Sequence, residues 1–234
     1  KESGREATMI VADLSSQADV KQAAEAFLSM EKPLDILLNN AGIMNRERKE
    51  TIDGLEEVFS VNHLAYFTFT LLLAEKLKNT SGSRVVNVAS GAHQFVKDMN
   101  FEDLQSEKTF RPMQVYGQSK LANILFTKSL SEKLSSFGVT VNCLHPGFVS
   151  TGIGSNNNQG LWPFLMFLAR PFARKTDKGA ETSIYLCCSS EVKDTTGEYF
   201  VDCKIEKISE AAKDPKQAAR LWDISEEITG LKLN

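Results

Sequence analysis

The chain has 234 residues, a formal net charge of -3 at pH 7 and 24% charged residues. This length provides one large domain with a sizeable core, and the charge balance excludes a basic nucleic-acid-binding surface. Three histidines and four cysteines show neither metal-ligand spacing nor a disulfide framework, so we expect no metal and free thiols in an intracellular, reducing compartment. The longest apolar run, 161–169, is too short to be a transmembrane segment.

Apolar runs and helical periodicities alternate along the chain. Such alternation is typical of a parallel sheet covered on both faces, so we predict an α/β fold, a doubly wound parallel sheet of Rossmann type, in a single domain over residues 1–234. In chain order we expect five strands: Thr8–Ala12, "DILL", "SRVVNVAS", "GVTVNCLHPG" and "GEYFVDC". A helix at Gln17–Met30 follows the first strand, and an apolar helix opened by a capping box of Asp53 and Glu56 follows the second. The helix that carries Tyr116 and ends at Gly138 follows the third strand, a helix at Lys178–Ser189 follows the fourth, and a helix with Asp214 as N-cap follows the fifth.

Polar and glycine residues collect where the predicted strands end. Asp13 follows the first strand, residues 39–42 ("NNAG") follow the second, Ser90 the third, and Pro146 with Gly147 the fourth. Ligands of open parallel sheets bind beyond the carboxyl ends of the strands. We therefore expect the functional site at this edge.

Tyr116 and Lys120 are four residues apart on one predicted helix, so they share a face. A nearby ammonium favours the phenolate and lowers the pKa of a tyrosine from about 10. Tyr116 would then exchange a proton with an alcohol or a carbonyl, and Ser90 would donate a hydrogen bond to the same oxygen. A solvated Tyr–Lys pair and a helix-capping serine are the alternative reading. The polar strand ends favour the catalytic one.

Two further features carry alternatives. In "NNAG", the small Ala41 and Gly42 let the backbone approach a flat ligand, and Asn39 or Asn40 ties neighbouring strand ends together. The alternative is that the motif is only an asparagine-rich turn. Asn62 lies inside a buried helix, where its amide needs partners. It either bonds to backbone alone or holds a water that leads protons toward Lys120, and its position favours the water.

The motifs "ADLSS", "NNAG", "YGQSK" and "HPGFVST", together with Asn62 and Ser90, resemble the short-chain dehydrogenase/reductase superfamily in this order. The resemblance implies that Tyr116 gives or takes the proton and that Lys120 holds the nicotinamide ribose and lowers the pKa of Tyr116. It further implies that Ser90 orients the substrate oxygen and that Asn62 completes a catalytic tetrad. The remaining cofactor-binding residues that it implies are Asp13, Leu14, Asn40, Ala41 and Gly42 around the adenine and Pro146, Gly147, Val149 and Thr151 around the carboxamide.

Within the superfamily, the chain is similar to the retinol dehydrogenase group. The stretch between Ser90 and Tyr116 is longer than usual and contains "FEDLQSEK", and "SKLANILFTK", "GAETSIYL" and "LWDISEEITGL" are also shared. This resemblance implies NADP(H), with NAD left open, and a small apolar substrate such as retinol, retinal or another aldehyde. Residues 151–175 become a substrate lid, unless they form only an amphipathic helix on the body. The resemblance further implies that the protein associates with a membrane surface, at the endoplasmic reticulum or another organelle. It also implies a homodimer that forms through the Tyr116 helix.

The glycine-rich TGxxxGIG turn of the superfamily has no match in these 234 residues. We therefore expect the chain to lack the first two strands and helices of the fold. The Thr8–Ala12 strand would have no partner, "DILL" would expose an apolar edge, and the 234 residues alone would be marginally stable and bind dinucleotide weakly. Two rival readings are a carbonyl reductase for other lipophilic substrates and a truncated, non-catalytic binding protein.

Overall fold

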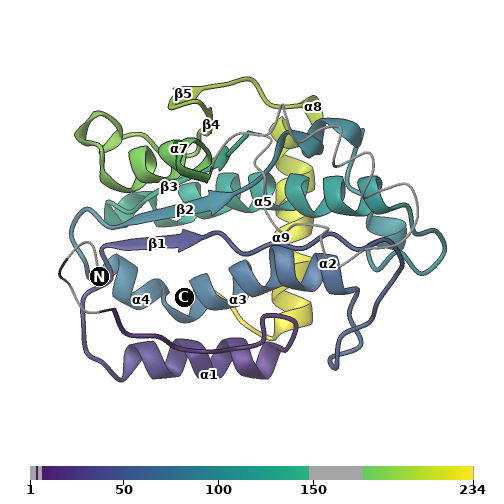
Figure 1. The fold of residues 1–234 in the computed structure, drawn as a ribbon, viewed down its shortest axis with the longest axis horizontal. Coiled ribbons are helices and arrows are strands. Elements are labelled where there is room, and N and C mark those ends of the chain that lie inside the picture. Colours follow the sequence, from purple (N-terminus) through teal and green to yellow (C-terminus); the bar gives the residue numbers. More distant parts are fainter. Residues whose placement is uncertain (1–3, 5–6, 148–175, 234) are drawn as a thin grey trace.

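A computed structural model describes residues 4, 7–147 and 176–233 and confirms the mainly parallel sheet (Figure 1). The sheet order is β1-β2-β3-β4-β5, with parallel pairing from β1 to β4 and an antiparallel β5. Sequence analysis did not predict β5. The strands are β1 Ile36–Asn39, β2 Arg84–Val88, β3 Thr140–His145, β4 Tyr199–Val201 and β5 Lys204–Ile205.

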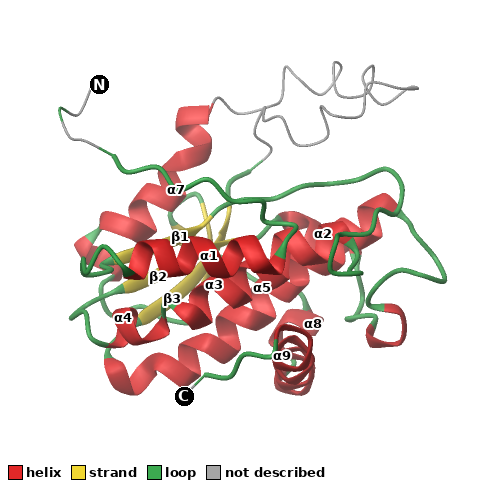
Figure 2. Cartoon of the chain, turned by 90° about the horizontal axis from the view of Figure 1, so that it is seen from below, coloured by secondary structure: helices red, strands yellow, loops and turns green. Residues whose placement is uncertain are grey.

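Helices cover both faces of this sheet, as a doubly wound fold requires (Figure 2). Helix α7 packs on one face, α3 and α5 pack on the other, and α1 lies outside α3. The described helices are α1 Gln17–Leu28, α2 Glu57–Phe59, the π-helical turn η1 Ser60–Leu64, α3 Ala65–Leu72, α4 Ala74–Lys78, the 3-10 turns η2 Gly91–Phe95 and η3 Phe101–Asp103, α5 Pro112–Leu134, η4 Ser135–Phe137, α7 Thr176–Cys188, η6 Ser190–Val192, α8 Glu210–Lys213 and α9 Pro215–Thr229.

The C-terminal helix α9 closes the core on the outer side of α3 and α5. Asp214 caps it through the Lys216 N–H, as predicted. The Trp222 ring stacks on Phe126 of α5 with centroids 5.9 Å apart, and it meets Phe67 of α3 edge-on at 5.0 Å. The part of α5 around Phe126 is therefore covered by the chain itself.

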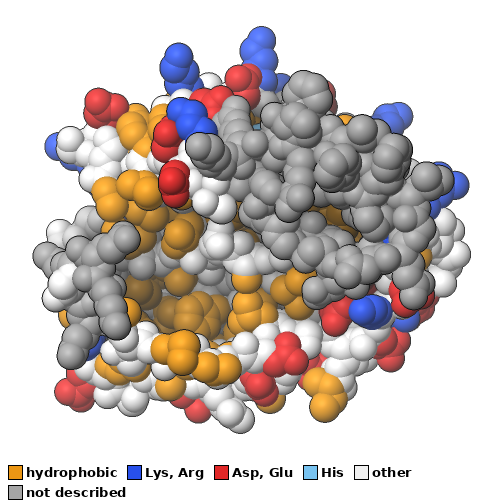
Figure 3. Space-filling model, in the orientation of Figure 1, with side chains coloured by type: hydrophobic (Ala, Val, Ile, Leu, Met, Phe, Trp, Pro, Cys, Tyr) orange, Lys and Arg blue, Asp and Glu red, His pale blue; other side chains and the backbone are white. Residues whose placement is uncertain are grey.

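The N-terminal segment differs from its prediction, while the expected open edge is confirmed. Thr8–Ala12 forms no strand, and Met9 and Val11 are exposed. β1 is the edge of the described sheet, and its outer face leaves 38% of Ile36 and 41% of Leu38 exposed. Hydrophobic side chains gather in a hollow over β1 and α3 (Figure 3). A strand without a hydrogen-bonding partner does not form in water, which explains why residues 8–12 are not a strand. The edge of β1 on that side of the described sheet therefore stays unpaired.

The predicted capping box is wrong. Glu56 itself caps α2 by accepting hydrogen bonds from the Val58 and Phe59 N–H groups, whereas Asp53 accepts one from Gln17 N–H at the start of α1. Residues 151–175, the expected lid, lie outside the described part of the chain. Among the described residues, no helix has the length and apolar character of a membrane span.

Candidate active site

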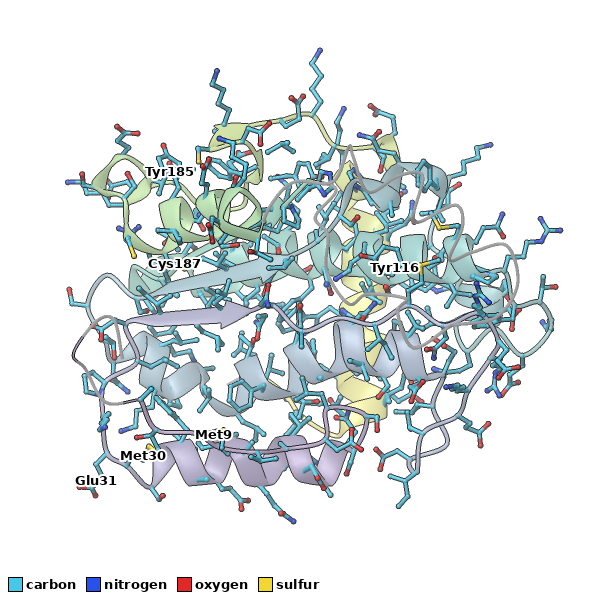
Figure 4. The ribbon with its side chains drawn as sticks, in the orientation of Figure 1. Met9, Met30, Glu31, Tyr116, Tyr185 and Cys187 are labelled. Atoms are coloured by element: carbon cyan, nitrogen blue, oxygen red, sulfur yellow. The ribbon has the colours of Figure 1, made fainter. Side chains whose placement is uncertain are left out.

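Helix α5 carries the predicted acid–base pair along the sheet. Tyr116 lies beyond the carboxyl ends of β1 and β2 (Figure 4). Gly117 lets η2 pack directly on α5, because a Cβ at this position would lie 2.8 Å from the Ala92 carbonyl oxygen and 3.1 Å from Val96 Cγ1. This close approach brings Ser90, the N-cap of η2, beside Tyr116.

The hydroxyl of Ser90 is oriented by its neighbours. Its Oγ accepts a hydrogen bond from the Ala92 N–H at 3.2 Å, so its own proton remains to be donated. The Ser90 carbonyl accepts from Nδ1 of the buried His93 at 2.7 Å, and His93 Nε2 accepts from the Ser209 N–H at 3.4 Å. These two partners define a neutral His93 with the proton on Nδ1, and burial lowers its pKa.

The expected effect of Lys120 on the pKa of Tyr116 is not found. Burial raises the pKa of Tyr116, and the side-chain hydrogen bond with Ser90 opposes this rise without reversing it. The Lys120 ammonium donates to the Val88 carbonyl at 3.0 Å and lies 5.7 Å from the Tyr116 ring centroid. The ammonium is thus directed toward β2, and desolvation of the phenol dominates the pKa of Tyr116.

Lys120 is itself fully enclosed by protein, with 2% of its surface exposed. Burial lowers the pKa of its ammonium to about 8, so the group remains mostly charged at pH 7. The ammonium lies one helical turn from the Tyr116 phenol along α5. The structure therefore brings Ser90, Tyr116 and Lys120 into one cluster.

Asn62 lies in the π-helical turn η1, a feature that is frequent at functional sites. Its Oδ1 accepts from the Ile43 N–H at 2.7 Å, and its Nδ2 donates to the Ile43 carbonyl and to Ser119 Oγ, each at 2.9 Å. Both amide protons are thus used. The side chain matches the backbone-bonding alternative, extended by Ser119, which in turn donates to the Tyr116 carbonyl.

Behind the cluster, a buried polar network joins β1 to β2, as expected for "NNAG". Asn39 Nδ2 donates to Asn87 Oδ1 at 2.8 Å and to Thr70 Oγ1 at 3.0 Å, and Asn87 Nδ2 donates to Thr127 Oγ1 on α5 at 2.9 Å. The amides satisfy each other away from water. They fix the two strand ends and α5 relative to one another.

The remaining predicted cofactor residues are distributed along the same edge. Gly42 approaches the cluster, because a Cβ there would lie 3.3 Å from Lys120 Nζ and 3.5 Å from Asn62 Oδ1. Asp13 accepts hydrogen bonds from Ser15, which lower its pKa. Asn40 and Asp13 are exposed, Leu14, Ala41, Gly42, Pro146 and Gly147 are half-buried, and Val149 and Thr151 lie outside the described residues.

Three residues of the site were missed by sequence analysis: His93, Ser119 and Tyr66. The Tyr66 hydroxyl donates to the Ala41 carbonyl, and its ring centroid lies 6.0 Å from Lys120 Nζ. Their residue types carry no distinctive signal in the sequence. His93 and Ser119 donate to backbone carbonyls three residues earlier, whereas Tyr66 donates to a carbonyl that only the fold brings near. Across the described ranges, acidic, histidine and cysteine side chains form no group that would hold a metal ion.

Comparison with known proteins agrees with this geometry. The profile of the short chain dehydrogenase family matches residues 1–162. Retinol dehydrogenase 12 of Mus musculus is 42% identical over 94% of this chain and 69% of its own length, and retinol dehydrogenase 14 of Homo sapiens is 43% identical over 94% of this chain and 66% of its own length. The chain thus spans about two thirds of these relatives.

A solved structure supports the same assignment. An uncharacterized protein from Mycobacterium Paratuberculosis superposes with a TM-score of 0.75 at 29% identity, over 95% of this chain and 75% of that one. The matched profile, the relatives and the parallel sheet with its polar strand ends agree. The chain belongs to the short chain dehydrogenase family and, within it, to the retinol dehydrogenase group.

Proposed function

We propose that the protein containing this chain is an oxidoreductase that transfers a hydride between NADP(H) and an apolar alcohol or aldehyde, with retinol and retinal as the first candidates. The observation that carries the proposal is the cluster of Ser90, the N-cap of η2, with Tyr116 on α5 and the Lys120 ammonium 5.7 Å from the Tyr116 ring centroid, at the carboxyl edge of the sheet. Relatives named retinol dehydrogenases support the substrate class.

The residues present fit the nicotinamide half of a dinucleotide. At Gly42 a side chain would crowd Lys120 and Asn62, so its absence lets the backbone pack closely on the cluster. The Lys120 ammonium, which donates to the Val88 carbonyl, would offer its other N–H donors to the ribose hydroxyls, and Asn40 to Gly42 would line the adenosine side. The dinucleotide, when bound, supplies or accepts the hydride.

Tyr116 and Ser90 divide the handling of the substrate oxygen. The raised pKa of Tyr116 keeps its phenol protonated at neutral pH, so it donates a proton to a carbonyl oxygen as the carbonyl is reduced. The Ser90 proton, left unused by the Ala92 contact, donates to the same oxygen and orients it.

A pyrophosphate-binding glycine turn has no match in the 234 residues, and β1 keeps an open edge. We therefore propose that this chain alone binds the dinucleotide weakly and is marginally stable, and that activity belongs to the full-length protein. Titration calorimetry with NADPH tests this point. Tight binding by the 234 residues alone would contradict it.

The enzymatic proposal is tested on the full-length protein with a substrate panel. Retinal, retinol and unrelated lipophilic aldehydes and ketones are assayed with NADPH, NADP, NADH and NAD, following absorbance at 340 nm. We expect retinal with NADPH to give the highest kcat/KM. A preference for other carbonyl compounds would assign a carbonyl reductase, and no turnover with any pair would leave the non-catalytic binding protein.

A further inference from the structure

The turn that the cofactor would approach, residues 40–43, is held from one helical surface. Asn62 and Tyr66 are four residues apart in η1 and α3, so both side chains reach the same segment. Asn62 binds both the N–H and the carbonyl of Ile43. Tyr66 donates its phenol proton to the Ala41 carbonyl. The two contacts lie on either side of Gly42.

These contacts fix the conformation of Gly42. The peptide plane before Gly42 contains the Ala41 carbonyl, and the plane after it contains the Ile43 N–H. Each plane is rigid, so a hydrogen bond to one atom in each restricts the two backbone dihedrals between them. Glycine has the widest conformational freedom, and without such contacts this residue would sample many arrangements.

Tyr66 is also buried near the Lys120 ammonium. Its side chain is 3% exposed, and the Lys120 ammonium lies 6.0 Å from its ring centroid and 5.7 Å from that of Tyr116. The ammonium is thus near both phenol rings. Burial raises the pKa of Tyr66, so its hydroxyl remains protonated and can only donate to the Ala41 carbonyl. The Tyr66 hydroxyl is therefore a donor at all pH values near neutrality, as a lasting hydrogen bond to the Ala41 carbonyl requires.

We propose that Tyr66 is a positioning residue for the dinucleotide: its hydroxyl holds the turn 40–43 in the conformation that receives the cofactor. This inference rests on the proposed function, because the turn matters only if a dinucleotide approaches it. Asn62 fixes one side of Gly42, and Tyr66 fixes the other. Loss of the hydroxyl frees the Ala41–Gly42 peptide while the phenyl ring continues to fill the core.

The test is Tyr66→Phe in the full-length protein, compared with the matched control Tyr185→Phe. Tyr185 lies on α7, far from Tyr116 in Figure 4, and its hydroxyl binds Glu191. A lost hydrogen bond of about 1 kcal/mol corresponds to roughly a five-fold change in binding. We expect Tyr66→Phe to raise the KM for NADPH by roughly five- to ten-fold, with kcat and substrate KM within two-fold of wild type.

Hydrogen exchange followed by mass spectrometry gives a readout that needs no cofactor. Peptides covering residues 40–43 should exchange faster in Tyr66→Phe, while peptides from α3 keep their protection and Tyr185→Phe matches wild type. An unchanged cofactor KM in an active enzyme overturns the inference, as does equal loss of kcat and cofactor binding. If the wild type turns over no dinucleotide, the proposed function fails, and unchanged exchange at residues 40–43 then separately overturns the contact.

Discussion

Replacing Gly117 with alanine tests how closely η2 must approach α5. The added Cβ would lie 2.8 Å from the Ala92 carbonyl oxygen and 3.1 Å from Val96 Cγ1, both shorter than ordinary contact. The carbonyl belongs to the backbone of η2 and cannot rotate away. η2 must therefore move, and Ser90, its N-cap, moves with it.

Gly117→Ala changes the free energy of unfolding by two effects of opposite sign, so enzymatic activity is the more sensitive measure of the displacement of η2. Alanine in a helix interior is favoured over glycine by about 1 kcal/mol. Overpacking of this kind costs about 1–3 kcal/mol. We therefore expect the free energy of unfolding to fall by only about 0–2 kcal/mol. Displacement of a reacting group by an ångström reduces the rate by about 100-fold, so kcat should fall by about 10- to 100-fold.

Urea denaturation and steady-state kinetics of the full-length protein measure the two effects. The double variant Val96→Ala/Gly117→Ala is the control, because it relieves the side-chain contact and leaves the clash with the Ala92 carbonyl. We expect its kcat to remain as low as that of Gly117→Ala. A kcat within two-fold of wild type, with unfolding free energy raised by about 1 kcal/mol from helix propensity alone, would refute the reasoning.

Three other outcomes follow from burial and exposure. Burial lowers the pKa of Lys120 to about 8, whereas an unfolded lysine titrates near 10.4, so the unfolded chain binds more protons between these values and the free energy of unfolding rises with pH there. Urea denaturation should show this rise in wild type and a flatter profile in Lys120→Met; equal slopes would contradict it. Burial lowers the pKa of His63 to about 3, so the free energy of unfolding falls as pH drops from about 6.5 toward 3. Circular dichroism should record a smaller loss in His63→Leu, and an identical loss would argue against His63 as its source. Leu38→Lys places a charge on the open edge of β1 and should reduce self-association of the 234-residue chain in sedimentation velocity; Ile52→Lys, at a turn residue 89% exposed, is the control and should have no effect.

The sequence predicted the parts of the fold that depend on local pattern. Apolar runs located β1 to β4. The helix that carries Tyr116 ends at Leu134 and continues as the 3-10 turn η4, which Gly138 closes with a φ of 72°. Proline after an aspartate located the start of α9. These signals come from residues that are close together in the chain, so they can be read without knowledge of tertiary contacts.

Other features depend on residues distant in sequence. Glu56 replaces the expected capping box because Asp53 is engaged by Gln17 of another helix. The pKa of Tyr116 depends on how deeply α5 is buried and on where the Lys120 ammonium points. Spacing along a helix places two groups on one face, but it does not determine which hydrogen bonds they make. The sequence thus predicted which groups lie together at this edge of the sheet, but it gave the wrong direction for the pKa of Tyr116.

The most direct test of the proposed chemistry is the turnover of Tyr116→Phe in the full-length protein, with retinal and NADPH at saturation. The variant keeps the ring beside Lys120 and loses the proton that the carbonyl oxygen must receive. General acid catalysis contributes about 100- to 10,000-fold, so we predict a fall in kcat of this size with the dissociation constant for NADPH within a few-fold of wild type. A variant that retains more than a tenth of the wild-type kcat would contradict the role of Tyr116, and with it the proposed reaction.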